Sequence, residues 1–318
     1  MPQRITRLAP SPTGALHLGN ARTFLVNWAL ARQNNWQVVL RIEDLDTPRT
    51  KPGANQQAID ILTWLGMDWD QGPYYQVNDL SPYLDALVQL GVQGQIYPCQ
   101  CTRSQIAAAA LSAPNAGDHD LRYPGTCRPA QDQAIAFEPD QYEDEAWRIR
   151  ADPEDVHFDD GFAGRQVGNV DQIVGDFIVA AKSGLPSYQL ACVVDDARQG
   201  ITDIVRGDDL IPSTPRQLML YRKLDLTPVP NYIHLPLVCG HDGRRLAKRH
   251  GDTKLTTYRS QGTPAERVIG LLAHWCGIVD RSSVCPMTAN DFLAEFALSK
   301  LPRDAVTFTP DDHRWLVD

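Results

Sequence analysis

Residues 7–20 place a histidine and two glycines at the break between an expected strand and an expected helix. The apolar run 5–9 ends in prolines and a glycine, and a helical apolar pattern begins near Leu18. A strand, a tight turn and a helix direct backbone N–H groups and the positive end of the helix dipole at a phosphate. His17 can donate a hydrogen bond to a phosphoryl oxygen, and Gly19 allows close backbone approach. The pattern favours a nucleotide site, although an ordinary βα turn has the same composition.

Charged residues at two other places can complete such a site. Glu43, Asp44 and Asp46 follow the apolar run 36–42, which is typical of a buried parallel strand. Ligands of open α/β sheets bind at the carboxyl ends of such strands. Four cations lie within residues 244–249, in a glycine-flanked loop that can close over a polyphosphate. A solvated loop is the alternative interpretation of both segments.

Three of the seven cysteines lie near one another in the sequence: Cys99, Cys101 and Cys127. This spacing suggests a small tetrahedral metal site that pins a loop, and buried free cysteines are the alternative. His119 and Tyr123 are both within reach as a fourth ligand. An odd number of cysteines in a long chain argues against a disulfide framework.

The overall composition excludes several other classes of protein. The net charge of −9 argues against general binding of polyanions, so any contact with nucleic acid needs a local basic patch. No apolar run approaches the roughly 18 residues of a membrane-spanning helix. The N-terminus also lacks the apolar segment of a signal peptide, and we therefore expect a cytoplasmic protein.

The elements that must position these residues alternate between strands and helices. Helices are predicted over 53–65 and from Ser81, as N-cap, to about residue 90. Capping boxes that begin at Thr214 and Thr263 predict two more. The acidic segment 130–170 is expected to be an insertion that packs at an edge rather than in the main sheet. A doubly wound parallel α/β sheet is the predicted fold class.

Taken together, the motifs resemble those of the class I aminoacyl-tRNA synthetases. Residues 17–20, His-Leu-Gly-Asn, correspond to the HIGH tetrad of that family, and residues 245–249, Arg-Leu-Ala-Lys-Arg, to its KMSKS loop. Three longer motifs resemble the glutamyl branch: Arg-Leu-Ala-Pro-Ser-Pro-Thr-Gly from Arg7, Arg-Ile-Glu-Asp-Leu-Asp from Arg41, and Val-Arg-Gly-Asp-Asp-Leu from Val205.

The resemblance implies a Rossmann-like catalytic domain whose two halves are residues 1–97 and 188–238. A zinc-containing α+β insertion, 98–187, would separate the halves, and a KMSKS-like loop with a small helical subdomain, 239–318, would follow. Because only about 65 residues follow the loop, we expect no anticodon-binding domain. The chain therefore resembles a short paralogue of glutamyl-tRNA synthetase. Such paralogues activate glutamate with ATP without tRNA and transfer it to the queuosine base of tRNA(Asp).

The same resemblance implies roles for individual residues. Glutamate binding falls on Arg7, Leu8, Ala9, Pro10, Ser11, Glu43, Tyr188 and Arg206. ATP binding, with Mg²⁺ on the phosphates, falls on His17, Gly19, Asn20, Arg245 and Lys248. Four of these are implied catalytic residues: His17, Gly19, Asn20 and Lys248. One structural zinc ion falls on Cys99, Cys101, Tyr123 and Cys127, which selects Tyr123 over His119.

The chain departs from the family pattern at Asn20, where HIGH has its second histidine, and at Arg245 and Ala247 in the KMSKS-like loop. Asn and Arg still donate hydrogen bonds to phosphates, so we expect reduced optimisation rather than loss. The expected partners are ATP, L-glutamate and queuosine-containing tRNA(Asp), and the expected state is a monomer. The alternatives are a glutamyl-tRNA synthetase-like protein with another acceptor, a non-catalytic paralogue, and a HIGH-type adenylyltransferase for another small acid.

Overall fold

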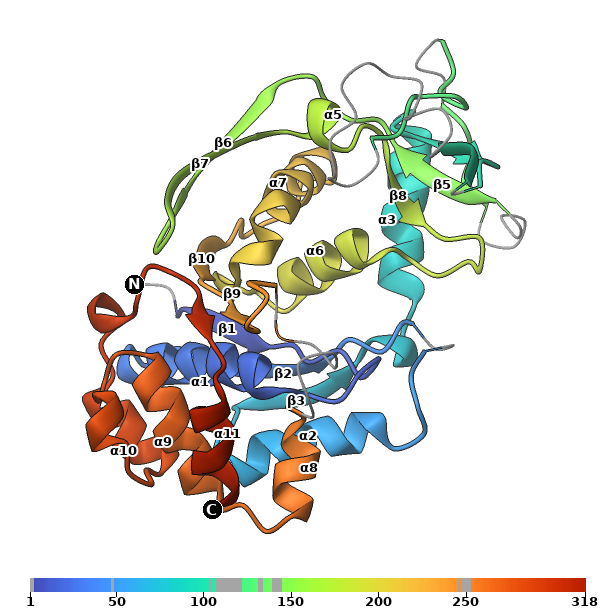
Figure 1. The fold of residues 1–318 in the computed structure, drawn as a ribbon. Coiled ribbons are helices and arrows are strands. Elements are labelled where there is room, and N and C mark those ends of the chain that lie inside the picture. Colours follow the sequence, from blue (N-terminus) through green and yellow to red (C-terminus); the bar gives the residue numbers. More distant parts are fainter. Residues whose placement is uncertain are drawn as a thin grey trace.

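The computed structural model describes residues 3–46, 49–102, 104–106, 122–130, 134–138, 145–244, 246 and 253–318. Two sheets form its centre (Figure 1). In the first sheet, β1 (Ile5–Leu8), β2 (Gln37–Ile42) and β3 (Gln71–Tyr75) run parallel in the order β1-β2-β3. The second has the order β7-β6-β10-β9 and consists of β6 (Asp155–Asp160), β7 (Gly164–Asn169), β9 (Asp203–Gly207) and β10 (Asn231–Leu235).

The two sheets meet edge to edge between β1 and β9. The main-chain N–H of Thr202 donates to the carbonyl oxygen of Ile5 at 2.9 Å, and α1 (Leu18–Gln33) packs against β1, β2 and β9. Strands β1, β2, β9 and β10 run parallel within their own sheets. Strand β2 is buried from Val38 to Ile42, as expected for a parallel strand covered on both faces. The predicted parallel α/β architecture is therefore confirmed.

Helices cover both faces of this central layer. Figure 1 shows α1 on one side of the strands and α6 and α7 on the other. Among the described residues before 230, the α-helices that follow α1 are α2 (Ala54–Trp64), α3 (Ser81–Val92), α5 (Val170–Ile173), α6 (Tyr188–Arg198) and α7 (Thr214–Lys223). None of the described helices is long and apolar enough to cross a membrane.

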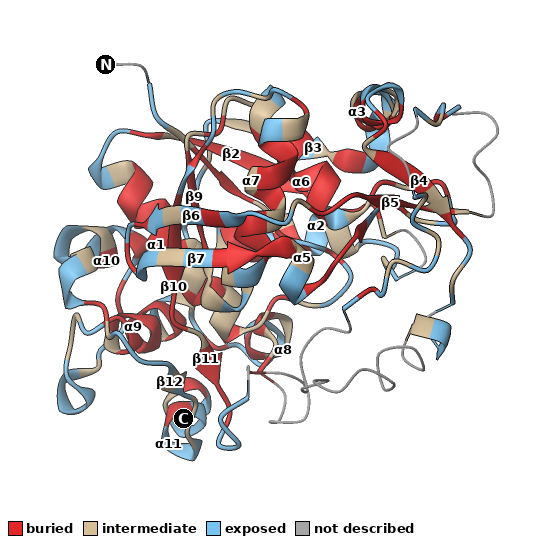
Figure 2. Cartoon of the chain, turned by 90° about the horizontal axis from the view of Figure 1, so that it is seen from above, coloured by how far each residue is buried: buried red, intermediate tan, exposed pale blue. Residues whose placement is uncertain are grey.

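The C-terminal part is mainly helical, as the sequence predicts. It contains α8 (Leu255–Ser260), α9 (Ala265–Trp275), α10 (Ala289–Glu295) and α11 (Pro310–Val317), with the short parallel pair β11 (Val238–Cys239) and β12 (Val306–Thr307). Apolar side chains such as Leu272 and Phe292 join Leu25 of α1 in one buried core. Figure 2 shows α1 and α9 with most of their residues buried. Burial against α1 therefore attaches these helices to the central layer.

A second core lies between the helices α3, α6 and α7 and a separate antiparallel sheet. That sheet has the order β4-β5-β8, with β4 (Ile96–Cys99), β5 (Ala146–Ile149) and β8 (Phe177–Ala180). Strands β5 and β8, which pair antiparallel, fit the predicted α+β insertion over residues 98–187. The boundaries between the four predicted segments stay a prediction.

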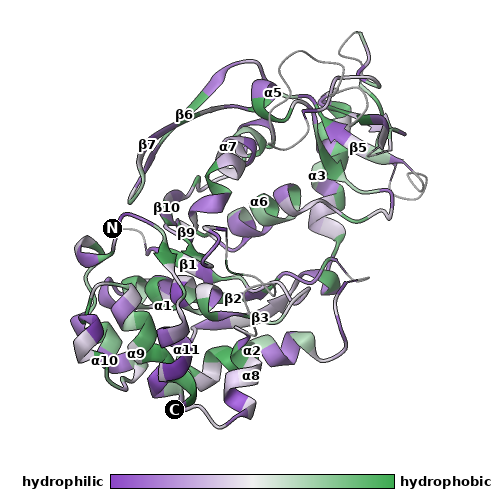
Figure 3. Cartoon of the chain, viewed as in Figure 1, coloured by the Kyte–Doolittle hydropathy of each residue, from purple (hydrophilic) through white to green (hydrophobic). Residues whose placement is uncertain are grey.

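The expectation for residues 130–170 needs a correction. Strand β6 runs parallel to β10, with Asp160 opposite Tyr232, and the N–H of Gly161 donates to the carbonyl oxygen of Tyr232 at 2.8 Å. The β6–β7 hairpin therefore extends the sheet that carries β9 and β10. The sequence concealed this because the hairpin is largely hydrophilic, as Figure 3 shows, and pairs mostly within itself.

The predicted helix starts are close, but three capping assignments are wrong. Helix α3 already includes Ser81, so this residue lies inside the helix rather than at its cap. No capping box forms at α7, where the Gln217 side chain instead accepts a hydrogen bond from Arg206. Helix α9 begins at Ala265 without a side-chain cap, and Thr263 donates to a main-chain oxygen of α11. The side chains of Gln217 and Thr263, which the sequence pattern assigned to helix caps, thus form hydrogen bonds with residues that are distant from the helix start or lie in another element.

Arg22 connects the C-terminal helices to the central layer. Its side chain is 1% exposed and donates to the carbonyl oxygens of Pro236, at 2.6 Å, and Trp275, at 3.2 Å. We expect Arg22→Ala to lower the free energy of unfolding by about 2–4 kcal/mol, because two buried carbonyl groups lose their donor. Urea unfolding followed by tryptophan fluorescence measures the change. The exposed Arg314→Ala is the control, and equal effects of the two substitutions would contradict the role of Arg22.

Candidate active site

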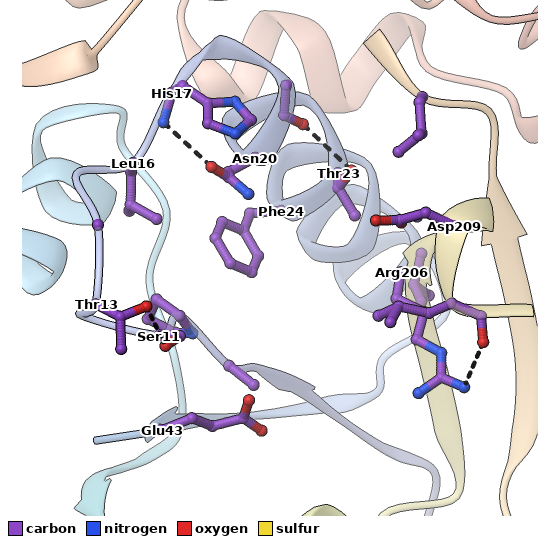
Figure 4. A pocket seen from close by; sticks show the side chains of 18 of the residues that line it. Ser11, Thr13, Leu16, His17, Asn20, Thr23, Phe24, Glu43, Arg206 and Asp209 are labelled. Carbon is purple, nitrogen blue, oxygen red and sulfur yellow. Dashed lines mark hydrogen bonds between the residues drawn. The ribbon is translucent and has the colours of Figure 1, made fainter. Parts of the chain in front are cut away.

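A cavity of about 450 Å³ opens where the strands of the central layer end. It brings together the predicted residues Arg7, Ala9, Pro10, Ser11, His17, Gly19, Asn20, Glu43, Tyr188 and Arg206. Figure 4 shows Glu43 and Ser11 at one end, His17 and Asn20 at the other, and Arg206 beside Asp209 on a third side. Leu8 is fully buried in the core beneath and does not line the cavity.

The turn between β1 and α1 forms one end of the cavity. His17 is the extended residue that precedes α1, and its N–H donates to Oδ1 of Asn20 at 3.2 Å. The asparagine that departs from HIGH therefore braces the turn. A Cβ atom on Gly19 would lie 3.2 Å from atoms of the His17 imidazole, so glycine lets that ring lie across the start of the helix. The positive end of a 16-residue helix consequently faces the cavity.

The segment that follows the KMSKS-like loop also contacts this turn. The N–H of Leu255 donates to the carbonyl oxygen of Leu16 at 2.9 Å, and the N–H of Leu18 donates to that of Thr253 at 3.2 Å. Within the KMSKS-like loop, the N–H of Leu246 donates to the carbonyl oxygen of Val238, which lines the cavity, at 2.9 Å. The loop at Leu246 and the segment that follows it are thus hydrogen-bonded at the rim of the cavity.

Four residues of the KMSKS-like loop lie outside the described residues. They are Arg245, Ala247, Lys248 and Arg249. The contacts with ATP predicted for Arg245 and Lys248 stay predictions.

Beneath the cavity lies an ion network that the sequence analysis missed. Arg7 Nε is 3.3 Å from Oδ1 of Asp196, and Arg41 Nη1 is 2.8 Å from the same oxygen. Arg41 Nη2 also lies 3.1 Å from Oε1 of Glu43. The available signal was the Asp195-Asp196 pair at the end of an apolar helical run, because buried acids need a cationic partner.

Burial and the two arginines shift the pKa values of Glu43 and Asp196 in opposite directions. Burial raises the pKa of Glu43 above its ordinary value, although Arg41 and Arg7 oppose the shift. Burial also acts to raise the pKa of Asp196, but the charges of Arg41 and Arg7 outweigh it and hold that pKa below its ordinary value. Asp196 is therefore the firm counter-ion of the two guanidinium groups, and Glu43 is the carboxyl group that faces the cavity.

Arg206 is held in a different way. Its guanidinium donates to Oε1 of Gln217 at 2.8 Å, to Oγ1 of Thr214 at 2.9 Å and to Nε2 of His234 at 3.0 Å. Among the residues that the structure describes, no carboxylate lies within ion-pair distance of Arg206. Since all these acceptors are uncharged, its positive charge remains available to an anion in the cavity.

Several further lining residues were not predicted from the sequence, and Thr23, Phe24 and Asp209 are among them. Phe24 lies seven positions after His17, so the helical period carries it to the same face of α1. Asp209 lies three residues after Arg206 in the motif Val-Arg-Gly-Asp-Asp-Leu, of which only Arg206 was given a role. The helical period and this motif were therefore signals for Phe24 and Asp209 in the sequence.

The cysteines predicted to bind a metal form one cluster. The Sγ atoms of Cys99, Cys101 and Cys127 all lie within 4.8 Å of one another, and Oη of Tyr123 is 3.4 Å from Cys99 Sγ. Tetrahedral zinc, with bonds of about 2.3 Å to sulfur, needs sulfur atoms about 3.8 Å apart. This donor set can therefore bind a metal ion. His119 lies outside the described residues.

The thiol of Cys99 has a lowered pKa, which favours metal binding. Burial raises the pKa of its thiol, but hydrogen bonds with Tyr123 and Arg148 outweigh burial and lower that pKa to about 7. The thiolate, which is the metal-binding form, is thus accessible near neutral pH.

The chain is similar to proteins of known family. Residues 4–308 match the family model described as tRNA synthetases class I (E and Q), catalytic domain. The chain belongs to this synthetase family. It is 46% identical over 324 residues to the Glutamyl-Q tRNA(Asp) synthetase of Rhodopirellula baltica, covering 96% of this chain and 93% of the relative. That of Symbiobacterium thermophilum is 42% identical over 313 residues, covering 94% of each chain.

The longer synthetases of the family match only in part. This synthetase is 37% identical to the glutamate–tRNA ligase of Geotalea uraniireducens over 98% of its own chain, which spans 64% of that ligase. The crystal structure of glutamate-tRNA synthetase from Elizabethkingia anophelis shows the same fold with a TM-score of 0.80 at 24% identity, covering 99% of this chain and 70% of the other. The expected class I catalytic domain and its glutamyl branch are confirmed.

The ion network of this synthetase generates a prediction about pH. The native pKa of Asp196 lies below its unfolded value of about 3.9, so the unfolded chain binds a proton first as the pH falls. The stability that Asp196 contributes is complete above about pH 5 and is lost as the pH falls through the native pKa. We expect Asp196→Asn to cost about 3–5 kcal/mol at pH 7, because two buried guanidinium groups lose their counter-ion.

Urea unfolding at a series of pH values between 3 and 7 measures this effect. The gap between the unsubstituted protein and Asp196→Asn should narrow below about pH 4. The exposed Asp304→Asn serves as the control and should follow the unsubstituted protein. A gap that stays constant over the whole series would show that Asp196 is not the titrating group.

Proposed function

We propose that this synthetase activates L-glutamate with ATP, without tRNA, and then transfers the glutamyl group to the queuosine base in the anticodon loop of tRNA(Asp). The observation that carries the proposal is the similarity to Glutamyl-Q tRNA(Asp) synthetases, at 42% and 46% identity, over at least 93% of each chain. Longer glutamate–tRNA ligases match at 37% identity over 64% of their length. The charges of the cavity support the choice of amino acid.

Glutamate carries two carboxylates and one ammonium group. The cavity offers the guanidinium groups of Arg7 and Arg206, and it also contains the carboxyl groups of Glu43 and Asp209. Arg206, with no described counter-ion, binds one carboxylate of the substrate, and Arg7 faces the other. Glu43 holds the ammonium group, while Ser11 and Tyr188 supply neutral hydroxyl groups. The Tyr188 side chain is 42% exposed and is thus accessible to a ligand.

ATP lies on the opposite side, at the start of α1. His17, Gly19 and Asn20 meet its phosphates, and Lys248 and Arg245 approach from the KMSKS-like loop. Mg²⁺, when bound to these phosphates, neutralises part of their charge. Arg206 and Arg7 hold the substrate so that an oxygen of its α-carboxylate attacks the α-phosphorus in line. The bond to the bridging oxygen breaks, and glutamyl-adenylate and pyrophosphate form.

No protein nucleophile takes part in this step. Catalysis consists of holding two reactants in line and stabilising the charge that develops on the leaving pyrophosphate. A nucleophilic group of the acceptor base then attacks the acyl carbon and displaces AMP. The monomeric state and the cytoplasmic location stay predictions.

The decisive experiment is ATP–pyrophosphate exchange in the absence of tRNA. We expect exchange with glutamate, and none with glutamine or aspartate, because the cavity has two cations for two carboxylates at one spacing. Transfer of labelled glutamate should then occur to tRNA(Asp) that contains queuosine and not to tRNA(Asp) that lacks it. Exchange with another amino acid only, or only after addition of tRNA, would contradict the proposal.

Lys248→Ala separates an enzyme from a non-catalytic paralogue. We expect a loss of exchange of about 100-fold or more, because the substitution removes a cation from the leaving pyrophosphate. Unchanged exchange would assign the activity to a contaminating enzyme and favour the non-catalytic alternative.

We further propose that the cysteine cluster holds one structural zinc ion with Tyr123 as the fourth ligand. Tyr123→Phe keeps the buried ring and removes only the hydroxyl group, so zinc should be lost to a chelator faster than from the unsubstituted protein. Cys127→Ser should bind less zinc still, and His119→Ala should retain it. Elemental analysis after dialysis measures the zinc content. Retention in Tyr123→Phe together with loss in His119→Ala would assign the fourth position to His119 instead.

A further inference from the structure

A buried row of three side chains, Asp160, His234 and Arg206, leads from the β6–β7 hairpin to the cavity. Oδ2 of Asp160 is 2.6 Å from Nδ1 of His234, and Nε of Arg206 donates to Nε2 of the same imidazole at 3.0 Å. The side chains of Asp160 and His234 are fully buried. The proposed reaction assigns no role to these two residues.

The chemistry of the row determines where its proton lies. A carboxylate only accepts hydrogen bonds, so the hydrogen between Asp160 and His234 belongs to Nδ1. Arg206 only donates, so Nε2 of His234 must carry the lone pair. Both neighbours therefore select the same neutral tautomer. Burial and the charge of Arg206 lower the pKa of His234 despite Asp160, which keeps the imidazole neutral.

Asp160 is itself fixed at the tip of β6. Its Oδ1 accepts from the main-chain N–H groups of Phe162, at 2.9 Å, and Ala163, at 2.7 Å. The N–H of His234 also lies 3.1 Å from Oδ1. The carboxylate therefore cannot rotate away, and Oδ2 remains directed at the imidazole.

The row holds the guanidinium of Arg206 without neutralising its positive charge. A carboxylate in direct contact would hold the guanidinium firmly but would also neutralise the charge that binds the substrate. A neutral imidazole holds Nε without that cost, and the carboxylate of Asp160 acts from one residue further away. Two uncharged groups also contact His234: the ring of Tyr232 stacks on it with the centroids 6.0 Å apart, and Thr214 Oγ1 lies 3.4 Å from Nε2. The charge of Arg7 acts with that of Arg206 to lower the pKa of His234.

We propose that Asp160 and His234 are positioning residues for Arg206, which hold its guanidinium toward a substrate carboxylate by fixing the tautomer of His234. The proposal rests on the proposed function, because it takes glutamate to be the anion at Arg206. Through Asp160, the β6–β7 hairpin would then contribute to binding of the amino acid.

Asp160→Asn is the sharpest test. The carbonyl oxygen of the introduced amide keeps the main-chain N–H groups of Phe162 and Ala163, so its NH₂ group must face His234 and donate to Nδ1. The imidazole then carries its hydrogen on Nε2, opposite the Nε–H of Arg206. We expect the KM for glutamate in ATP–pyrophosphate exchange to rise about 10- to 100-fold, with the KM for ATP changed less than about 2-fold.

Two substitutions of His234 provide an independent measurement. The side-chain oxygen of His234→Gln can accept from Nε of Arg206, whereas His234→Leu offers no acceptor. We expect His234→Gln to have a KM for glutamate at least about 5-fold below that of His234→Leu. Equal values for the two variants would overturn the proposal.

A buried carboxylate outside the cavity gives the matched control. Asp312, which is 3% exposed, accepts from Arg281 at 2.6 Å and from the N–H of Thr309 at 2.8 Å. Asp312→Asn should lower the melting temperature without raising the KM for glutamate. A rise equal to that of Asp160→Asn would reduce the role of Asp160 to general stability and overturn the proposal.

Failure of this proposal is distinguishable from failure of the proposed function. Glutamate-dependent exchange in the unsubstituted protein, with an unchanged KM for glutamate in Asp160→Asn, would overturn the positioning role alone. Absence of glutamate-dependent exchange in the unsubstituted protein would overturn the proposed function, and the positioning role with it.

Discussion

The carboxylate of Asp196 between Arg7 and Arg41 is the interaction on which the site depends. It joins β1 and β2, which come early in the chain, to α6, which comes much later. Buried charges are costly unless they are paired, so the energy of this network strongly disfavours any arrangement that separates the three residues. The cavity exists because these two distant parts of the chain are held at one place.

The same constraint gives the two arginines of the cavity different electrostatic characters. Arg7 shares a carboxylate with Arg41, and part of its charge is already compensated. Arg206 has only uncharged acceptors among the described residues. A ligand with two carboxylates therefore meets one strongly attractive and one moderated cation. This difference is consistent with a site that must bind an amino acid firmly and still release its activated form.

The β6–β7 hairpin shows how a segment between the catalytic strands contributes to the catalytic layer. Its tip contains Phe162, which joins the core around α1, and Arg303 from the C-terminal part stacks on that ring. Asp160 at the same tip reaches His234 on β10. The hairpin therefore links three parts of the chain, and its hydrophilic sequence reflects an edge position rather than independence from the sheet.

The sequence by itself indicated the alternation of strands and helices and the three neighbouring cysteines, through local periodicity, turn residues and spacing. The resemblance of its motifs to the synthetase family pointed to ten of the residues that line the cavity. The tertiary structure decided which side chains pair. Gln217 bonds Arg206 instead of capping α7, and Asp196 serves Arg7 and Arg41. These pairings depend on residues that only folding brings together, because a buried polar group forms its hydrogen bonds with the groups that lie beside it in the folded protein.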